Sequence, residues 1–330
     1  MMNKCKYADC KDRALSLSDY CFKHIDDKNA YRQKLTEYID EHGSIKDFYL
    51  RRLEFPEAQW QNIDAEDVDL AGADLSYADL AAASFKRANL TGASLRKANL
   101  ASVDFEEVHL LKSDLSGARL WYASLTNSYL AEANLENADF LKTELSGVKL
   151  WYAKLDGAKL LTRHSFLGRT PICEKGPLAA SEAYRNLKQY FIVNGRYDDA
   201  SWACFKERQL ERRYLFKEKK LAYLPSLLMA LLCGYGEKPY RVIASSIVFV
   251  ASYAIAYAGL GVLNPTTVYK SFSSWDYIYF SIVTFTTLGY GDLTPKAVPL
   301  FQMLAGSESF IGAFMMGLFI FTLARKYTAR

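Results

Sequence analysis

The residues best suited to chemistry lie near the C-terminal end, where positions 284–292 read TFTTLGYGD. A cation that enters a narrow pore loses its water and needs replacement oxygens, which backbone carbonyls can supply. Four successive residues offer such carbonyls: Thr287, Leu288, Gly289 and Tyr290. For these carbonyls to face one axis, the backbone must alternate between ordinary and left-handed dihedral angles. Gly289 and Gly291 adopt positive φ without steric cost, so the pattern indicates a site for a dehydrated cation.

The same segment resembles the selectivity filter of potassium channels. The usual form of that filter is TxGYGD, which here runs from Thr287 to Asp292 with Leu288 at the variable position. The resemblance implies that K⁺ is the transported ion. One such segment cannot enclose an ion, because a ring of carbonyls requires several strands around one axis. The resemblance therefore implies a homotetramer.

Two apolar stretches flank the segment and predict membrane spans. Residues 242–263 contain no charged side chain and are long enough to cross a hydrocarbon layer of roughly 30 Å. Residues 297–324 form the second predicted span. Residues 272–286 are too short to cross and lead straight into the filter, so we expect a re-entrant pore helix that is shielded from lipid by protein.

The basic residues next to the spans predict how the protein is oriented in the cell membrane, which is the plasma membrane or the inner membrane. Arg241 precedes the first span, whereas three basic residues follow the second: Arg325, Lys326 and Arg330. Basic residues favour the cytoplasmic side, so we expect a multi-pass protein with both termini in the cytoplasm. Neither span has arginines at every third position, and no voltage sensor of the usual kind is expected.

Several further residues of the pore region are predicted to support it. Glu308 is the ionisable residue inside the second span, where a carboxylate requires a partner or a proton. We expect it to stand behind the pore helix or filter, with a direct role in the ion path as the alternative. Many potassium channels have an aromatic donor thirteen positions before the filter aspartate, where this chain has Tyr279. Gly306 and Gly312 are candidate gating hinges, and close helix packing is the alternative for both.

A period of five dominates the N-terminal two thirds of the chain. From Leu70 to Leu160 every fifth residue is Leu or Phe, and a small residue, mostly Ala, precedes it by two positions. Neither a helix nor a strand has this period, which indicates a repeat architecture. Phrases such as ADLSYADL resemble pentapeptide-repeat proteins. The resemblance implies that residues 64–162 form a quadrilateral β-helix of fewer than five coils, which we interpret as a scaffold.

The first 28 residues contain a possible metal site. Cys5, Cys10, Cys21 and His24 have the spacing C-x4-C-x10-C-x2-H, and three thiolates with one imidazole can complete tetrahedral Zn²⁺ coordination. A segment this short has too small a hydrophobic core to fold without a bound metal ion. We expect structural zinc, with reduced and unpaired side chains as the alternative.

Three further segments connect these parts. Residues 29–63 are predicted to be a linker of short helices, with Pro56 breaking one of them. Residues 176–222 have the apolar spacing of a helical hairpin. Residues 223–240 contain an apolar stretch too short to span, which follows a basic run; we expect a helix lying along the inner membrane surface. The pore domain then occupies residues 241–330.

Composition narrows the functional classes. A net charge of +4 over 330 residues does not suggest a nucleic-acid partner, and no catalytic constellation accompanies the four histidines, which argues against an enzyme. The fold class is therefore multidomain, with a repeat β-helix and an all-α pore. Two functions stay open. One is a potassium channel whose cytoplasmic domain assembles or gates it, with a cytoplasmic ligand or protein as a possible effector. The other is a membrane-tethered scaffold for a protein partner, with a constitutively open or vestigial pore.

Overall fold

The computed structural model describes all residues except 1–3, 8, 167–175, 265–271 and 329–330. The chain divides into two compact units, Met1–Tyr214 and Leu215–Arg330. The first unit contains the repeats and the second contains the apolar helices. Each unit is considered separately below.

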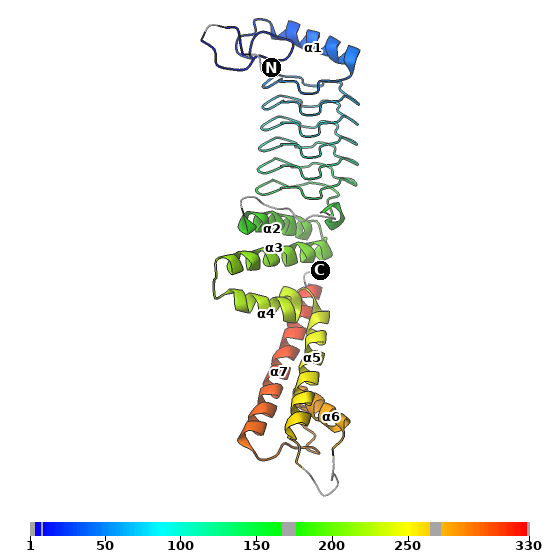
Figure 1. Ribbon diagram of the computed structural model, residues 1–330. Coiled ribbons are helices and arrows are strands. Elements are labelled where there is room, and N and C mark those ends of the chain that lie inside the picture. The colour runs from blue at the N-terminus through cyan, green and yellow to red at the C-terminus, as the bar shows by residue number, and fades with distance from the viewer. Residues whose placement is uncertain (1–3, 8, 167–175, 265–271, 329–330) are drawn as a thin grey trace. The chain divides into compact units, whose positions relative to one another are not determined.

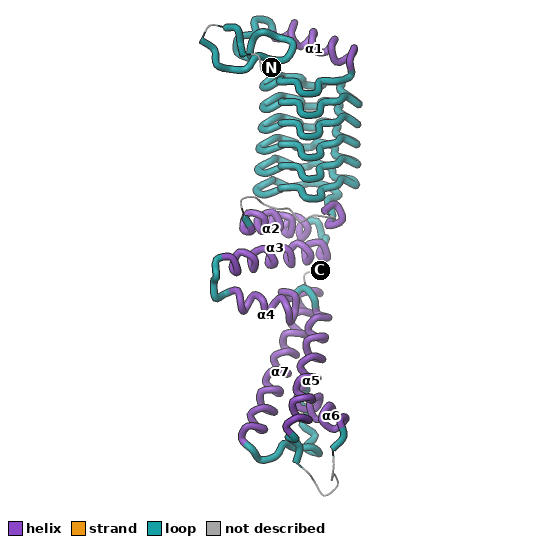
Figure 2. The backbone as a smooth tube through the Cα atoms, in the orientation of Figure 1, coloured by secondary structure: helices purple, strands orange, loops and turns teal. Residues whose placement is uncertain are grey.

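The repeats of the first unit form a stack of coils (Figure 2). Parallel bridges join residues 20 positions apart, from Ser44 and Asp64 at one end to Asp139 and Lys159 at the other. The large residue of each repeat points inward: Leu75, Phe85 and Leu95 are fully buried, and their equivalents up to Leu155 are buried, whereas Leu160 at the end of the series is half exposed. The second residue after it has a left-handed φ, such as 61° at Tyr77, which turns the chain to the next side of the coil.

The stack begins one coil earlier than the sequence indicates. Residues 29–63 were expected to be helical, but only α1, Lys28–His42, is a helix, and the first bridge starts at Ser44. Ile45, Leu50 and Trp60 are buried at the same period of five. Pro56 lies in a turn of this coil, where its fixed φ is accommodated, and does not break a helix. The prediction failed because Ala65, Trp60 and Ile45 here replace the Leu and Phe of the later repeats.

Helices close both ends of the stack (Figure 1). At the N-terminal end, α1 contributes Tyr31, Leu35 and Ile39 to the same buried core as the coils. At the other end, the short helix η1, Arg163–Phe166, is followed by α2, Pro177–Val193, and α3, Tyr197–Lys217. The α2 side chains Tyr184 and Phe191 belong to that core as well.

An ion-pair network joins α2 to α3. Glu207 of α3 is buried and accepts from Arg185 Nε at 2.9 Å and from Lys188 Nζ at 2.8 Å. Burial raises the pKa of Glu207, but the bonds from Lys188 and Arg185 outweigh it and hold the pKa below the usual glutamate range. The hairpin is therefore fastened by a charged carboxylate.

The second unit consists of helices. Its elements are α4, Tyr223–Cys233; the short helix η2, Gly234–Gly236; α5, Pro239–Leu260; α6, Ser274–Phe285; and α7, Pro299–Thr328. Helices α5 and α7 are long and apolar enough to cross a membrane, and only 17% of each apolar window is buried. A buried core helix of a soluble protein would be mostly covered, so the exposed apolar surface of α5 and α7 favours a lipid environment.

The observed bounds differ slightly from the predicted ones. Helix α5 starts with Pro239 in its first turn and ends at Gly261, whose φ of 58° is the left-handed conformation of a helix cap. The first apolar helix is therefore shifted about three residues toward the N-terminus of the expected span. Helix α7 continues beyond Ala324 to Thr328.

Candidate functional site

The segment after α6 has the backbone conformation that the sequence suggests. Helix α6 begins with a capping box, in which the Ser273 side chain and the Asp276 carboxylate each accept a backbone N–H. After its last residue, Phe285, the chain takes left-handed φ at alternate positions: 59° at Thr287, 54° at Gly289 and 78° at Gly291. Successive carbonyls in such an alternation can face the same side.

This segment is open to its surroundings, whereas the helix behind it is packed. Leu288 and Tyr290 are 59% and 68% exposed, while Ser281 and Phe280 of α6 are buried. A hydrogen bond holds the outer end of the segment: Tyr279 Oη donates to Asp292 Oδ2 at 2.8 Å, across thirteen positions. The structure thus brings together two predicted site residues, Tyr279 and Asp292.

Glu308 ties three helices together. It lies on α7, is fully buried, and accepts a hydrogen bond from Tyr257 Oη of α5 at 2.5 Å. The Ser281 hydroxyl of α6 bonds to the other carboxylate oxygen, Oε1, and also lies 2.9 Å from the carbonyl oxygen of Val250. Sequence analysis located Glu308 but missed Tyr257 and Ser281.

The two candidate hinge glycines have different surroundings. A Cβ at Gly312 would collide with the carbonyl group of Phe285, the last residue of α6, and would lie 2.7 Å from its carbonyl carbon. At Gly306, no other described atom lies within 4 Å of the same position. Both glycines lie within one uninterrupted helix, α7. Gly312 therefore serves close packing, as the alternative interpretation proposed.

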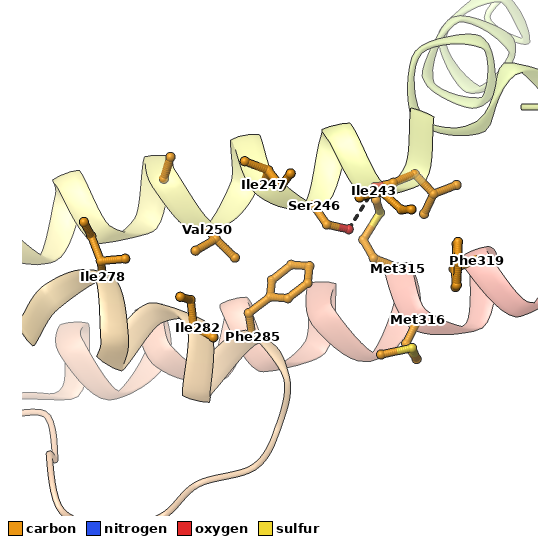
Figure 3. Close-up of a pocket in the computed structure, with 12 residues that line it drawn as sticks. Ile243, Ser246, Ile247, Val250, Ile278, Ile282, Phe285, Met315, Met316 and Phe319 are labelled. Carbon is orange, nitrogen blue, oxygen red and sulfur yellow. Dashed lines mark hydrogen bonds between the residues drawn. The ribbon is translucent and has the colours of Figure 1, made fainter. Parts of the chain in front are cut away.

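An apolar pocket of about 530 Å³ lies between α5, α6 and α7 (Figure 3). Ile247 and Val250 come from α5, and Phe285 extends into the space from the end of α6. Met315 and Phe319 complete the wall from α7. The pocket reaches the helix end from which the 287–292 segment emerges, and it is lined almost entirely by hydrocarbon.

The end of α7 is fastened to the turn between α4 and α5. Arg325 Nη2 pairs with Glu237 Oε1 at 2.7 Å, and Nη1 donates to the carbonyl oxygen of Tyr235 at 3.2 Å. Gly236 lies against this contact with φ of 84°, and a Cβ there would meet Phe321 and Arg325 at 3.2–3.3 Å. Displacement of this turn would therefore be transmitted directly to α7.

The four predicted metal ligands are brought together in the first unit. The sulfur atoms of Cys5, Cys10 and Cys21 and a ring nitrogen of His24 all lie within 4.8 Å of one another. Burial raises the pKa of the Cys5 thiol, but the backbone N–H groups of Cys21 and Tyr7 and the His24 side chain bring its pKa down to about 6. A thiolate is the form that binds metal.

Comparison with known proteins agrees with this division of the chain. Residues 242–329 match the family model described as ion channel, and residues 83–121 and 123–160 match pentapeptide repeats, in eight copies. Neither is a family of enzymes. No curated protein matches.

Among solved structures, the crystal structure of the pentapeptide repeat protein Rfr23 from the cyanobacterium Cyanothece 51142 is similar over 39% of this chain and 99% of its own, at 17% identity and a TM-score of 0.35. A pentapeptide repeat protein of the Arabidopsis thaliana thylakoid lumen is similar over 32% of this chain and 70% of its own, at 30% identity and a TM-score of 0.29. By the two family models, residues 242–329 form an ion channel domain and residues 83–160 contain pentapeptide repeats, so the chain combines these two kinds of domain.

Proposed function

We propose that the chain is one subunit of a potassium-selective channel formed by four identical copies. The observation that carries this proposal is the segment after α6, where left-handed residues alternate from Thr287 to Gly291. The Tyr279 hydrogen bond to Asp292 holds this segment at its outer end. Backbone carbonyls arranged in this way replace the water shell of K⁺. Residues 287–292 are then the selectivity filter, and K⁺ is the transported ion.

Four copies are needed because each chain supplies one filter segment. The single chain exposes large apolar side chains that neighbouring copies and lipid would cover in this arrangement. These include Leu288 and Tyr290 of the filter segment and Met303 and Phe310 of α7. In this arrangement α6 is a re-entrant pore helix whose C-terminal end faces the ion path. The negative end of its dipole would favour a cation there.

The proposed topology places both termini in the cytoplasm of a cell whose plasma or inner membrane α5 and α7 cross. Arg241 and Arg325 lie at the same end of the two spans, as the positive-inside rule requires for cytoplasmic residues. Arg330, also used in the prediction, lies outside the described residues. Helix α4 exposes Leu224, Leu228 and Leu231, and Lys219 and Lys220 precede it, which supports a position at the lipid interface.

We assign the repeat domain the role of a scaffold that assembles or gates the channel. The proposed channel has no voltage sensor. We propose that the coils of the repeat domain form a quadrilateral β-helix with four repeats in each 20-residue turn, which the bridges between residues 20 positions apart support. The contact of Arg325 with Glu237 and Tyr235 offers a route by which movement of α4 would reach α7. The effector, a cytoplasmic ligand or protein, would act through this turn. Zn²⁺ is proposed as the structural ion of the Cys5, Cys10, Cys21 and His24 cluster.

Flux into proteoliposomes tests the channel function. We expect K⁺ uptake that excludes Na⁺, is blocked by Ba²⁺, and is abolished by Gly289→Asp, since a side chain at this left-handed position would distort the filter. Ser252→Ala, on the exposed part of α5, is the matched control and should leave uptake unchanged. A well-folded tetramer without flux would overturn the proposal and favour a tethered scaffold with a vestigial pore.

A further inference from the structure

We propose that Cys5, Cys10, Cys21 and His24 bind one Zn²⁺ ion, and that the bound ion holds residues 4–7 and 9–25 as a lid on the N-terminal end of the repeat stack, beside α1. This inference rests on the zinc ion proposed above and does not depend on ion conduction. It assigns the metal a definite task, which is to hold this segment against the Tyr49 side of the first coil.

The spacing of the ligand atoms fits a tetrahedral zinc site. With Zn–S bonds of about 2.3 Å and a Zn–N bond of about 2.0 Å, the edges of the tetrahedron are about 3.8 Å between sulfurs and about 3.5 Å between sulfur and nitrogen. The Sγ atoms of Cys10 and Cys21 are 3.8 Å apart, and His24 Nδ1 lies 3.6 Å from Cys5 Sγ and 3.3 Å from Cys21 Sγ. Three of the six distances between ligand atoms thus match the edges of a zinc tetrahedron, and all four atoms lie within 4.8 Å of one another.

The backbone supports the same arrangement. The Cys21 N–H donates to Cys5 Sγ at 3.3 Å, a bond that stabilises a metal-bound thiolate. The Cys5 N–H donates to the Asp12 carbonyl at 3.0 Å, which closes the loop containing Cys10. The buried apolar core of the described part of this segment is small, since Ala14 and Leu15 are its buried apolar residues besides the ligand cysteines. The free energy of metal binding would therefore supply much of the folding free energy of the lid.

Residues just after the first ligand loop pair with the first coil. The Ser16 N–H donates to the Tyr49 carbonyl at 3.1 Å, and the Tyr49 N–H donates to Ser16 Oγ at 2.9 Å. On its other side, Tyr49 is bridged to Asp69 of the next coil. Ser16 thus takes the position that a preceding coil would occupy if the stack continued.

Other contacts fasten the same lid. Leu15 enters the core of the stack, and the Arg13 guanidinium lies over the Tyr49 ring at 4.6 Å. From α1, Tyr31 Oη donates to the Ser16 carbonyl at 2.6 Å and Lys34 Nζ to the Leu17 carbonyl at 2.9 Å. An uncovered coil edge pairs readily with the edge of another molecule. We infer that loss of the ion loosens the lid and exposes the edge of the first coil at Tyr49.

The test uses the full-length protein in detergent, with zinc content and amide hydrogen exchange as readouts. We expect one zinc per chain, and replacement by Co²⁺ should produce the thiolate charge-transfer and visible bands of a tetrahedral site. Cys10→Ser and His24→Ala should lose the ion. The matched controls Cys204→Ala and His42→Ala, outside the cluster, should retain it.

Removal of zinc by a chelator tests whether the bound ion holds the lid against the first coil. We expect faster exchange at amides of residues 4–25 and of the first coil, residues 44–60, with unchanged exchange in the coils from residue 80 to residue 140. Absence of stoichiometric zinc, or zinc loss without faster exchange at 44–60, would overturn the inference. Ion flux is not measured in this test. A negative result for the zinc-held lid would therefore leave the channel proposal intact, and absence of ion flux would leave the lid proposal intact.

Discussion

Gly312 of α7 lies directly against the carbonyl group of Phe285, the last residue of α6. Because Phe285 comes two residues before Thr287, this contact sets the distance between α7 and the start of the proposed filter. Ser309, one turn earlier on α7, donates to the neighbouring Thr284 carbonyl at 3.1 Å. The absence of a side chain at 312 therefore permits a helix contact and does not by itself indicate a bend.

The first prediction separates packing from hinge bending. Gly312→Ala should lower the free energy of unfolding of the protein by an amount typical of overpacking, about 1–3 kcal/mol, because a backbone carbonyl cannot move aside. Gly306→Ala and Gly317→Ala should be neutral or stabilising by up to about 1 kcal/mol, since alanine favours a helix. Thermal unfolding of the three variants checks this. Equal stability of Gly312→Ala and Gly306→Ala would contradict the packing role.

The second prediction concerns the bond between Tyr279 and Asp292. A hydrogen bond to a charged group contributes about 1.5–3 kcal/mol. Tyr279→Phe should therefore shorten the conducting periods of single channels, because the outer end of the filter loses its tether. Tyr253→Phe, which removes a 2.9 Å bond to Ser307 away from the filter, is the control. Identical open lifetimes in the two variants would show that the bond does not support the filter.

The third prediction concerns Glu308. The side-chain oxygen of a glutamine at this position can still accept a hydrogen bond from the Tyr257 hydroxyl. Its amide N–H can donate to the Ser281 hydroxyl oxygen, and the Ser281 proton can then be donated to the Val250 carbonyl. We expect Glu308→Gln to retain tetramer stability and flux. Glu308→Ala should be destabilising by about 1–3 kcal/mol because it removes the acceptor of the buried Tyr257 hydroxyl, whereas Ser281 keeps the Val250 carbonyl as its acceptor. Thermal unfolding and flux measured on both variants check this, and a tolerated alanine would contradict the structural role.

The fourth prediction is a pH dependence of the α2–α3 hairpin. The pKa of Glu207 is lowered in the folded state, so its stabilisation is complete above the unfolded glutamate pKa of about 4.3 and is lost as the pH falls through the folded value. Glu207→Gln should be destabilising at pH 7 by about 1.5–3 kcal/mol. The difference in Tm from the unmodified protein should shrink below pH 4.3.

Glu182→Gln provides the control for this pH dependence. Glu182 pairs with the same arginine, Arg185, but both side chains of this pair are partly exposed. The expected loss of stability is therefore below about 1 kcal/mol. A Tm difference for Glu207→Gln that stays constant with pH would show that the carboxylate charge does not fasten the hairpin.

Local patterns made the repeats and the filter predictable. The inward Leu or Phe of each repeat recurs every five residues, and Gly289 and Gly291 mark left-handed positions directly. The first coil was missed because Ile45 and Trp60 occupy the inward positions there. The small residue Ala65 also occupies an inward position, so a search that accepts any apolar residue at this period would have extended the stack back to Ser44.

Contacts between distant segments could not be predicted from the sequence. Tyr257 and Ser281 lie 51 and 27 positions from Glu308, and no local pattern relates them. The contact between Gly312 and Phe285 likewise depends on how two helices approach each other. The Cys/His cluster was predictable because its four ligands lie within 20 consecutive residues.

Potassium selectivity is the central claim, and the reversal potential of the reconstituted channel between K⁺ on one side and Na⁺ on the other tests it most directly. A filter of carbonyls that fits dehydrated K⁺ should give a reversal potential displaced toward the K⁺ equilibrium value. Each tenfold preference for K⁺ adds about 59 mV. We predict a displacement well above 59 mV. A reversal potential near zero, in channels that conduct both ions, would contradict the account.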